Sequence, residues 1–100
     1  MTSLRFEGDA VKAATNRRKH GVSFEEARSV FLDEEALLIA DPEHSESEDR
    51  FVLLGLSARI RVLVVVHAYR AGTDVIRLIS ARKADRDEQL TYNRRRRRSD

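Results

Sequence analysis

One stretch of the chain, residues 60–68, constrains the fold more than any other. It reads Ile-Arg-Val-Leu-Val-Val-Val-His-Ala, so apolar residues occupy both sets of alternating positions. Successive side chains of a β-strand point to opposite faces of the sheet, so a strand with this pattern is apolar on both faces. The stretch therefore predicts the central strand of a sheet.

Three further β-rich runs surround this strand in the chain. Residues 50–56 (RFVLLGL) precede it, and residues 74–82 (DVIRLISAR) follow it after a short connection. Connections of this length suit hairpins and are too short for parallel crossovers. Residues 36–42 (ALLIADP) form another run that stops at Asp-Pro. We therefore expect an antiparallel meander.

The N-terminal third carries the signals of two helices. Asp9 is a candidate N-cap for a helix that runs through about Lys19, and Gly21 stands where a left-handed C-terminal cap needs glycine. Ser23 and Glu26 have the spacing of a capping box and start a second helix. The sequence thus predicts a helical hairpin.

The last β-rich run leads directly into another helix. Asp85 and Glu88 repeat the capping-box spacing and start this helix near Arg86. Arg82 and Lys83 stand just before it, although a helix N-terminus is partially positive and favours anions. A bound anion would remove this conflict, and nucleic-acid phosphate is the candidate for a chain rich in arginine. Alternatively, Arg82 bonds a carboxylate such as that of Glu88, and Lys83 extends into solvent.

These elements define one α+β domain. Residues 3–7 suit a short first strand, which gives the order β-α-α-β-β-β-β-α, with the helices covering one face of a mostly antiparallel sheet. The domain is expected to span residues 1–93. Residues 94–100 begin with five arginines and are expected to be a basic, disordered tail. The formal net charge of +2 is the sum of +4 in this tail and −2 in residues 1–93.

Composition and spacing exclude several classes of site. The chain has no cysteine, which rules out disulfides and cysteine metal sites. Its three histidines show neither HxxxH nor HExxH spacing, and no glycine-rich phosphate loop is present, so we expect no metal and no cofactor. No apolar run approaches about 18 residues, and the N-terminus lacks the apolar core of a signal peptide. We therefore expect a cytoplasmic protein without membrane contact.

Several titratable side chains have two interpretations. His67 ends the apolar strand and is either a general acid or base, since imidazole titrates near neutral pH, or a strand-end histidine bonded to the backbone. Glu48 precedes Arg50 in an acidic loop and is either solvated or part of an acid–base pair. Lys19 and His20 end a helix, where cations interact favourably with the helix dipole, and this interaction alone explains their presence.

Four segments, in order along the chain, together point to a known family. They are NRRKHGVSFEEARSVFLD (16–33), DPEHSESEDRFVLLG (41–55), RVLVVVHAY (61–69) and RLISARKADRDE (77–88). In combination they resemble the BrnT family of bacterial type II toxins. The chain departs from the family at its opening FEGDA, where Gly8 and Ala10 replace the usual tryptophan and proline.

This resemblance implies a RelE-like fold and a metal-independent ribonuclease that shuts down translation. It also implies neutralisation by a BrnA-type antitoxin with a ribbon-helix-helix domain, in a complex of two toxins and two antitoxins on operator DNA. The expected reaction is attack of a ribose 2′-OH on the adjacent phosphate, with a general base, a general acid and cations that stabilise the charge on phosphorus. An alternative is a non-catalytic, toxin-like module that acts only as co-repressor with an antitoxin on operator DNA.

The resemblance also suggests which residues would act. Glu48 or His67 would be the base or the acid, and Arg82 and Lys83 would complete the catalytic group. The remaining RNA contacts would come from Arg50, Arg77, Lys19, His20 and Tyr92.

Overall fold

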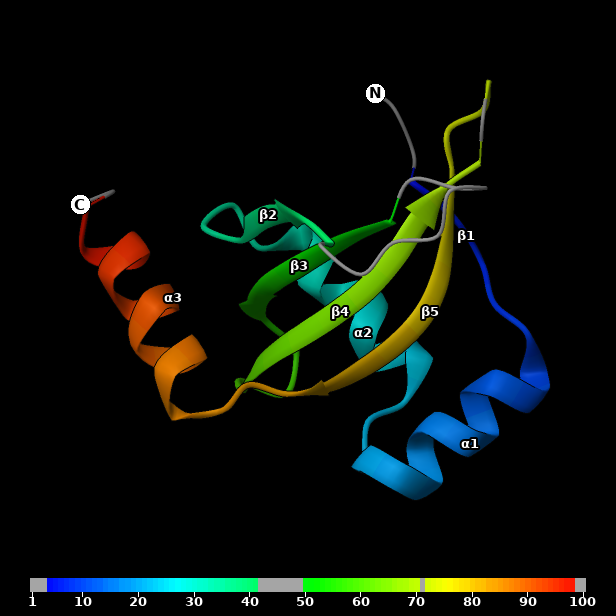
Figure 1. Cartoon of the computed structure of the whole chain (residues 1–100), viewed down its shortest axis with the longest axis horizontal. Coiled ribbons are helices and arrows are strands. Elements are labelled where there is room, and N and C mark those ends of the chain that lie inside the picture. The colour runs from blue at the N-terminus through cyan, green and yellow to red at the C-terminus, as the bar shows by residue number, and fades with distance from the viewer. Residues whose placement is uncertain (1–3, 42–49, 71, 99–100) are drawn as a thin grey trace.

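The computed structural model of the chain describes residues 4–41, 50–70 and 72–98. Its elements are β1 (Arg5–Glu7), α1 (Ala10–His20), α2 (Phe24–Ser29), the 3-10 helix η1 (Val30–Leu32), β2 (Leu37–Ala40), β3 (Arg50–Leu56), β4 (Val62–Tyr69), β5 (Val75–Lys83) and α3 (Arg86–Arg98). This arrangement confirms the predicted α+β class and order (Figure 1). Among the described residues, none of the helices combines the length and apolar character that crossing a membrane requires.

The five described strands form one mixed sheet in the order β1-β5-β4-β3-β2. β2, β3, β4 and β5 pair antiparallel with their neighbours, as the meander predicted, and β4 is the central strand. β1 pairs parallel with β5. Helices, loops and three strands separate β1 from β5 in the chain, which provides the long connection that parallel pairing needs.

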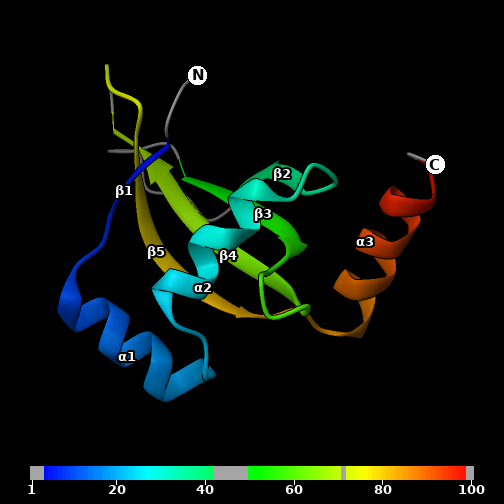
Figure 2. The ribbon, with the colours of Figure 1, turned by 180° about the vertical axis from the view of Figure 1, so that it is seen from behind.

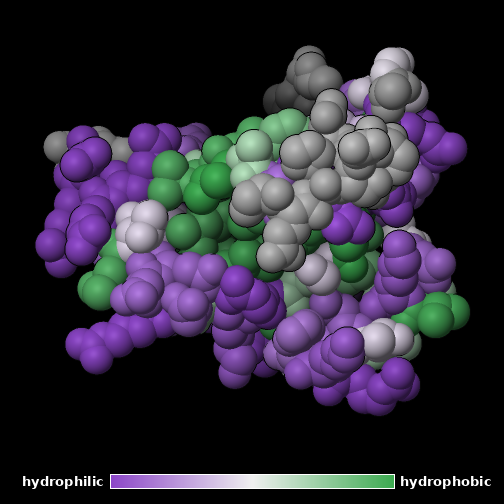
Figure 3. Space-filling model, in the orientation of Figure 1, coloured by the Kyte–Doolittle hydropathy of each residue, from purple (hydrophilic) through white to green (hydrophobic). Residues whose placement is uncertain are grey.

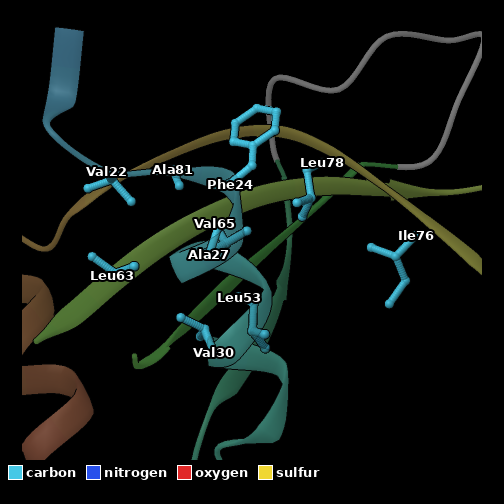
Figure 4. Close-up of a cluster of buried hydrophobic side chains, with 10 residues drawn as sticks. All are labelled: Val22, Phe24, Ala27, Val30, Leu53, Leu63, Val65, Ile76, Leu78 and Ala81. Carbon is cyan, nitrogen blue, oxygen red and sulfur yellow. The ribbon is translucent and has the colours of Figure 1, made fainter. Parts of the chain in front are cut away.

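Helices lie on both faces of the sheet, so the expectation of one covered face was wrong. α1, α2 and η1 cover the face that holds Leu63 and Val65 of β4, here called the α2 face (Figures 2 and 4). On the opposite face, here called the α3 face, Tyr92 of α3 packs with Val62 and Val64. Both faces need cover because β4 is apolar at both sets of alternating positions.

Three predicted helix boundaries are confirmed by their capping hydrogen bonds. Asp9 caps α1, and Gly21 ends it in the left-handed conformation with φ 68°. At the start of α3 the capping box is reciprocal: the Glu88 N–H donates to Asp85 Oδ1, and the Asp85 N–H donates to Glu88 Oε1, both at 2.8 Å. Local sequence alone therefore places these helix ends.

α3 continues beyond the expected end of the domain. Residues 94–98, predicted to belong to a disordered tail, form the last turns of this helix. Arginine has a high helix propensity, and cations in a last turn interact favourably with the helix dipole. The arginine run therefore extends the helix, and its side chains project from an ordered element.

Glu26 has a different role from the one its spacing predicted. Its N–H donates to Ser23 Oγ at 3.0 Å, which caps α2, but its carboxylate is buried and turned toward the sheet. There it accepts hydrogen bonds from Ser57 Oγ at 2.7 Å and from Arg61 Nε and Nη2 at 2.7 and 2.6 Å. These charge-assisted bonds replace the reciprocal capping bond, so the prediction of a full capping box was wrong at this position.

The side chain of Asn16 connects α1 to the sheet. Its Nδ2 donates to the carbonyls of Val22 and Ala81 at 2.9 and 2.8 Å, and its Oδ1 accepts from the Ala81 N–H at 2.9 Å. β1 pairs with residues 75–77 of β5, so the backbone of Ala81 lies past the end of that partner strand. The amide therefore satisfies buried backbone groups that lack a strand neighbour.

Tyr92 attaches α3 to the sheet. Its side chain is 1% exposed, and its hydroxyl donates to Asp33 Oδ2 at 2.6 Å. The same carboxylate oxygen accepts the Leu56 N–H at 2.8 Å. Burial and the nearby Asp33 carboxylate raise the pKa of Tyr92 to about 12. Asp33 thus joins the segment after η1, the end of β3 and α3 through one carboxylate.

Replacing Tyr92 with phenylalanine should keep the buried ring and remove only the hydroxyl. We expect the Tyr92→Phe protein to lose about 1–2 kcal/mol of unfolding free energy, because a buried bond to a charged carboxylate is lost. Urea denaturation followed by circular dichroism measures this difference. The matched control is Leu90→Ala at an exposed position of α3, with an expected change below about 0.5 kcal/mol. Equal stability of Tyr92→Phe and wild type would contradict the role of the hydroxyl.

The Glu26–Arg61 pair should make stability depend on pH. Hydrogen bonding from Arg61 holds the pKa of Glu26 below its ordinary value of 4.5. Such a carboxylate stabilises the fold above its unfolded pKa, and this contribution is lost as pH falls through the folded pKa. We therefore expect Glu26→Gln to melt below wild type at pH 7 and the difference to shrink below about pH 4.5. A constant difference in melting temperature across that range would argue against the pair.

Candidate nucleic-acid interface

Two arginines flank the central strand on the α3 face. Arg50 of β3 and Arg77 of β5 both pair with Ala68 of β4, from opposite sides. Paired residues on neighbouring strands point to the same face, so both side chains lie on one face, roughly 10 Å apart at their backbones. The structure therefore brings together these two predicted phosphate contacts.

A β-bulge places Arg82 on the same face. Arg77 pairs with Ala68 and Arg82 with Val64, and these two β4 residues share a face. An odd separation of five residues would normally put the two arginines on opposite faces. The register shift between β4 and β5 leaves Ile79 as an extra residue, which restores the common face. Their partners on β4 are four residues apart, so the two arginines are roughly 13 Å apart along the strand.

Arg82 has a carboxylate partner. Its Nη1 and Nη2 donate to Glu88 Oε1 and Oε2 at 2.8 and 2.9 Å, in a bidentate arrangement. Hydrogen bonding from Arg82 also lowers the pKa of Glu88. Of the two interpretations of this helix start, the structure shows the ion pair. Glu88 thus relieves the unfavourable charge at the helix N-terminus, and no bound anion is needed for that purpose.

Lys83 lies in a different basic group. It is exposed and pairs with Leu63, and its ammonium group forms no hydrogen bond or ion pair with the described residues. Arg61, two residues before Leu63, donates to the carbonyl of the glycine that ends α1. Lys83 therefore lies at the end of the sheet where α1 ends with the exposed Lys19 and His20. The predicted RNA contacts divide between this end and the α3 face.

His67 is buried within aromatic rings and 0% exposed. Its ring contacts those of Phe31 and Tyr69, with centroids 4.9 and 5.3 Å away, and a tilted Phe51 at 6.2 Å. Its Nδ1 lies 3.2 Å from the Val65 carbonyl, and burial lowers the pKa of the imidazole. The structure therefore matches the second interpretation, a strand-end histidine beside a backbone carbonyl, and the catalytic role of His67 stays a prediction.

Tyr92 and Glu48 are two further residues that the sequence predicted at the site. Tyr92 was expected to contact RNA, but its ring is buried under α3 and its hydroxyl is bonded to Asp33. Tyr92 is therefore the apolar anchor of α3 in this structure, and its contact with RNA stays a prediction. Glu48 lies outside the residues that the structure describes.

A hollow of about 630 Å³ lies beside Arg77 at the edge of the sheet. It is lined by Arg77, Leu78, the segment Phe6–Asp9 and Lys12 of α1. Its size is within the range of small-ligand sites, and its lining carries two cations, Arg77 and Lys12, and two carboxylates, Glu7 and Asp9. Sequence reasoning missed Lys12, since a single exposed lysine on a helix carries no signal of its own. No group of three His, Asp or Glu side chains in the described part of the chain could hold a metal ion.

Comparison with known proteins identifies the family of this chain. A family described as "Ribonuclease toxin, BrnT, of type II toxin-antitoxin system" matches residues 9–88. Among solved structures, the chain is similar to the crystal structure of the Brucella abortus ribonuclease toxin BrnT, with 21% identity, a TM-score of 0.63, and coverage of 84% of this chain and 100% of that chain. No curated protein matches at a significant level. Because the family match spans most of the chain, the chain belongs to the BrnT family of ribonuclease toxins of type II toxin-antitoxin systems.

Proposed function

We propose that this chain is a metal-independent endoribonuclease that cleaves RNA, blocks translation and is neutralised by a BrnA-type antitoxin. Its family is one of ribonuclease toxins. The observation that carries the proposal is the common placement of Arg50, Arg77 and Arg82 on the α3 face. Guanidinium groups bind phosphate through paired hydrogen bonds, and a row of them suits a polyanion such as RNA.

The proposed reaction uses the 2′-OH of the RNA itself as nucleophile. A general base removes the proton of the 2′-OH, and its oxygen attacks the adjacent phosphorus. The bond from phosphorus to the 5′-oxygen breaks, and a general acid protonates that leaving oxygen. The products are a 2′,3′-cyclic phosphate and a 5′-OH. Cations near the phosphate stabilise the charge that builds up on its oxygens in the transition state.

We assign roles from chemistry and position in the chain. Arg50 and Arg77 bind the phosphate, because they point to one face across a single residue of β4. Glu48 is the general base: it stands two positions before Arg50, and a carboxylate is ionised at neutral pH. Lys83 and the glutamate-bound Arg82 bind neighbouring parts of the RNA.

A protein antitoxin is part of this proposal. The family is defined by type II toxin-antitoxin systems, in which the neutralising partner is a protein. We propose that a ribbon-helix-helix antitoxin of the BrnA type binds this chain in an assembly of two toxins and two antitoxins, and that the assembly binds operator DNA. Lys19 and His20, exposed at the end of α1, extend the RNA-binding surface of the free toxin.

Purified chain without antitoxin should cleave RNA in the presence of EDTA. The 2′-OH mechanism needs no metal, so the products should carry 2′,3′-cyclic or 3′-phosphate ends and a 5′-OH, identified by mass spectrometry. An RNA whose 2′-OH groups are methylated is the control and should remain intact. Cleavage that stops in EDTA would contradict the metal-independent mechanism, and absence of cleavage under all conditions would favour the co-repressor alternative.

Lys83→Ala should reduce RNA cleavage without loss of stability. The ammonium group has no partner among the described residues, so the melting temperature should stay within about 2 °C of wild type. Loss of a cation that binds RNA should lower kcat/KM by about tenfold or more. Arg5→Ala removes the same charge from β1, beside the opposite end of β5, and is the matched control. If both variants reduce cleavage equally, net charge rather than the position of Lys83 determines activity.

A further inference from the structure

β2 is an edge strand whose outer side pairs with no other described strand. Among the described strands its one neighbour is β3. The Asp41 N–H donates to the carbonyl of Arg50, its partner in the β2–β3 register, so Leu37, Ile39 and Asp41 bond toward β3. Bonding direction alternates along an antiparallel strand, so Leu38 and Ala40 direct their N–H and C=O groups outward.

The side chains of this edge are apolar on both faces of the sheet. Leu38 points to the α2 face, where it is 51% exposed, and Leu32 of the preceding η1 is 79% exposed. Ile39 points to the α3 face and is 46% exposed. Edge strands usually carry charged residues or proline, which prevent pairing with other chains. β2 has the composition of an interior strand that lacks one neighbour.

A groove between β2 and α3 adds positive charge to this apolar edge. It encloses about 320 Å³ and is lined by Leu37, Thr91, Arg94, Arg95 and Arg98. It is followed by a second hollow of about 190 Å³, which is lined by Ile39, Val52, Leu54, Val64 and Thr91 and by the carboxylates of Asp87 and Glu88. Figure 3 shows these surroundings as hydrophobic residues exposed next to the hydrophilic residues of α3.

We propose that the β2 edge binds an extended segment of a partner protein as an additional antiparallel strand. The backbone of that segment would bond the outward N–H and C=O groups of Leu38 and Ala40. Its side chains on the α2 face would be apolar and cover Leu38. Its side chains on the α3 face would be carboxylates that reach Arg94 and Arg98. The partner segment therefore alternates apolar and acidic residues.

Charge selects this partner over a second copy of the chain. Antiparallel pairing of two β2 strands about a two-fold axis would keep both α3 helices on the same face of the joined sheet. The arginine runs of the two helices would then face each other and repel, whereas an acidic segment neutralises them. The phosphates of RNA would pair with the arginines. RNA has no peptide backbone that could bond to a strand edge, however, and no apolar side chains that could cover Leu38.

Under the proposed function, the segment belongs to the antitoxin, and in this respect the inference depends on that function. The surface itself can be tested independently of RNA cleavage. If the chain does not cleave RNA but binds such a segment, the docking surface stands and the proposed catalytic function fails. If it cleaves RNA but does not bind the segment, the proposed catalytic function stands and the docking surface fails.

The test uses a short blocked peptide in which valine and glutamate alternate. Amide hydrogen exchange of the full chain is followed by NMR with and without this peptide. We expect the amides of Leu38 and Ala40 to become protected, while those of Leu37 and Ile39, already bonded to β3, change little. A peptide with lysine in place of glutamate is the control and should bind about tenfold more weakly. Lack of protection at Leu38 and Ala40, or equal binding of both peptides, would overturn the proposal.

A charge-reversal variant tests the orientation of the added strand. Arg94→Glu combined with Arg98→Glu should reverse the preference, so that the lysine peptide binds more tightly than the glutamate peptide. Arg97→Glu changes the same helix outside the groove lining and should keep the original preference. If a single-stranded RNA oligonucleotide protects Leu38 and Ala40 and the acidic peptide does not, the edge is an RNA site and the proposal is wrong.

Discussion

Burial of β4 on both faces is the constraint on which the rest of the structure depends. Its alternating positions supply the centres of two apolar clusters, one with Leu63 and Val65 and the other with Val62 and Val64. Each cluster needs its own cover, and the chain supplies α1 and α2 on one face and α3 on the other. The expectation that helices cover one face of the sheet was wrong because β4 is apolar on both faces.

Apolar burial is non-directional, and three polar side chains, two buried and one half-buried, specify where the helices lie. Asn16 bonds to the backbone of β5, Glu26 binds Arg61 of the β3–β4 connection, and Asp33 joins Tyr92 to the end of β3. Each contact satisfies a group that would be costly to bury alone. Close approach also matters, since a side chain at Gly55 would collide with Ala36 and Val30. The helices are thus positioned by specific bonds and fit as well as by hydrophobic contact.

The partial cover of the α3 face leaves room for function. α3 contacts the sheet through Tyr92 near one end of β4, where Arg82 binds Glu88 of α3. Arg50 and Arg77 lie beside Ala68, toward the other end of β4 on that face. The placement of these arginines could be predicted only in part. Arg50 follows from the register of a simple hairpin, but Arg77 and Arg82 share a face because of the bulge at Ile79. A bulge depends on how two strands pair, and no local pattern in the sequence predicts it.

The sequence by itself determined the order of the elements, the caps at Asp9, Gly21 and Asp85, the central position of β4 and the family of the chain. These features depend on residues close together in the chain or on the pattern of one strand. Only the tertiary structure decided that His67 is enclosed by aromatic rings, that Tyr92 is an anchor, and that Glu26 and Glu88 hold arginines. The physical reason is that burial and pairing depend on partners brought close by folding. A side chain such as Asp33 meets Tyr92 across 59 positions of sequence, which local spacing cannot reveal.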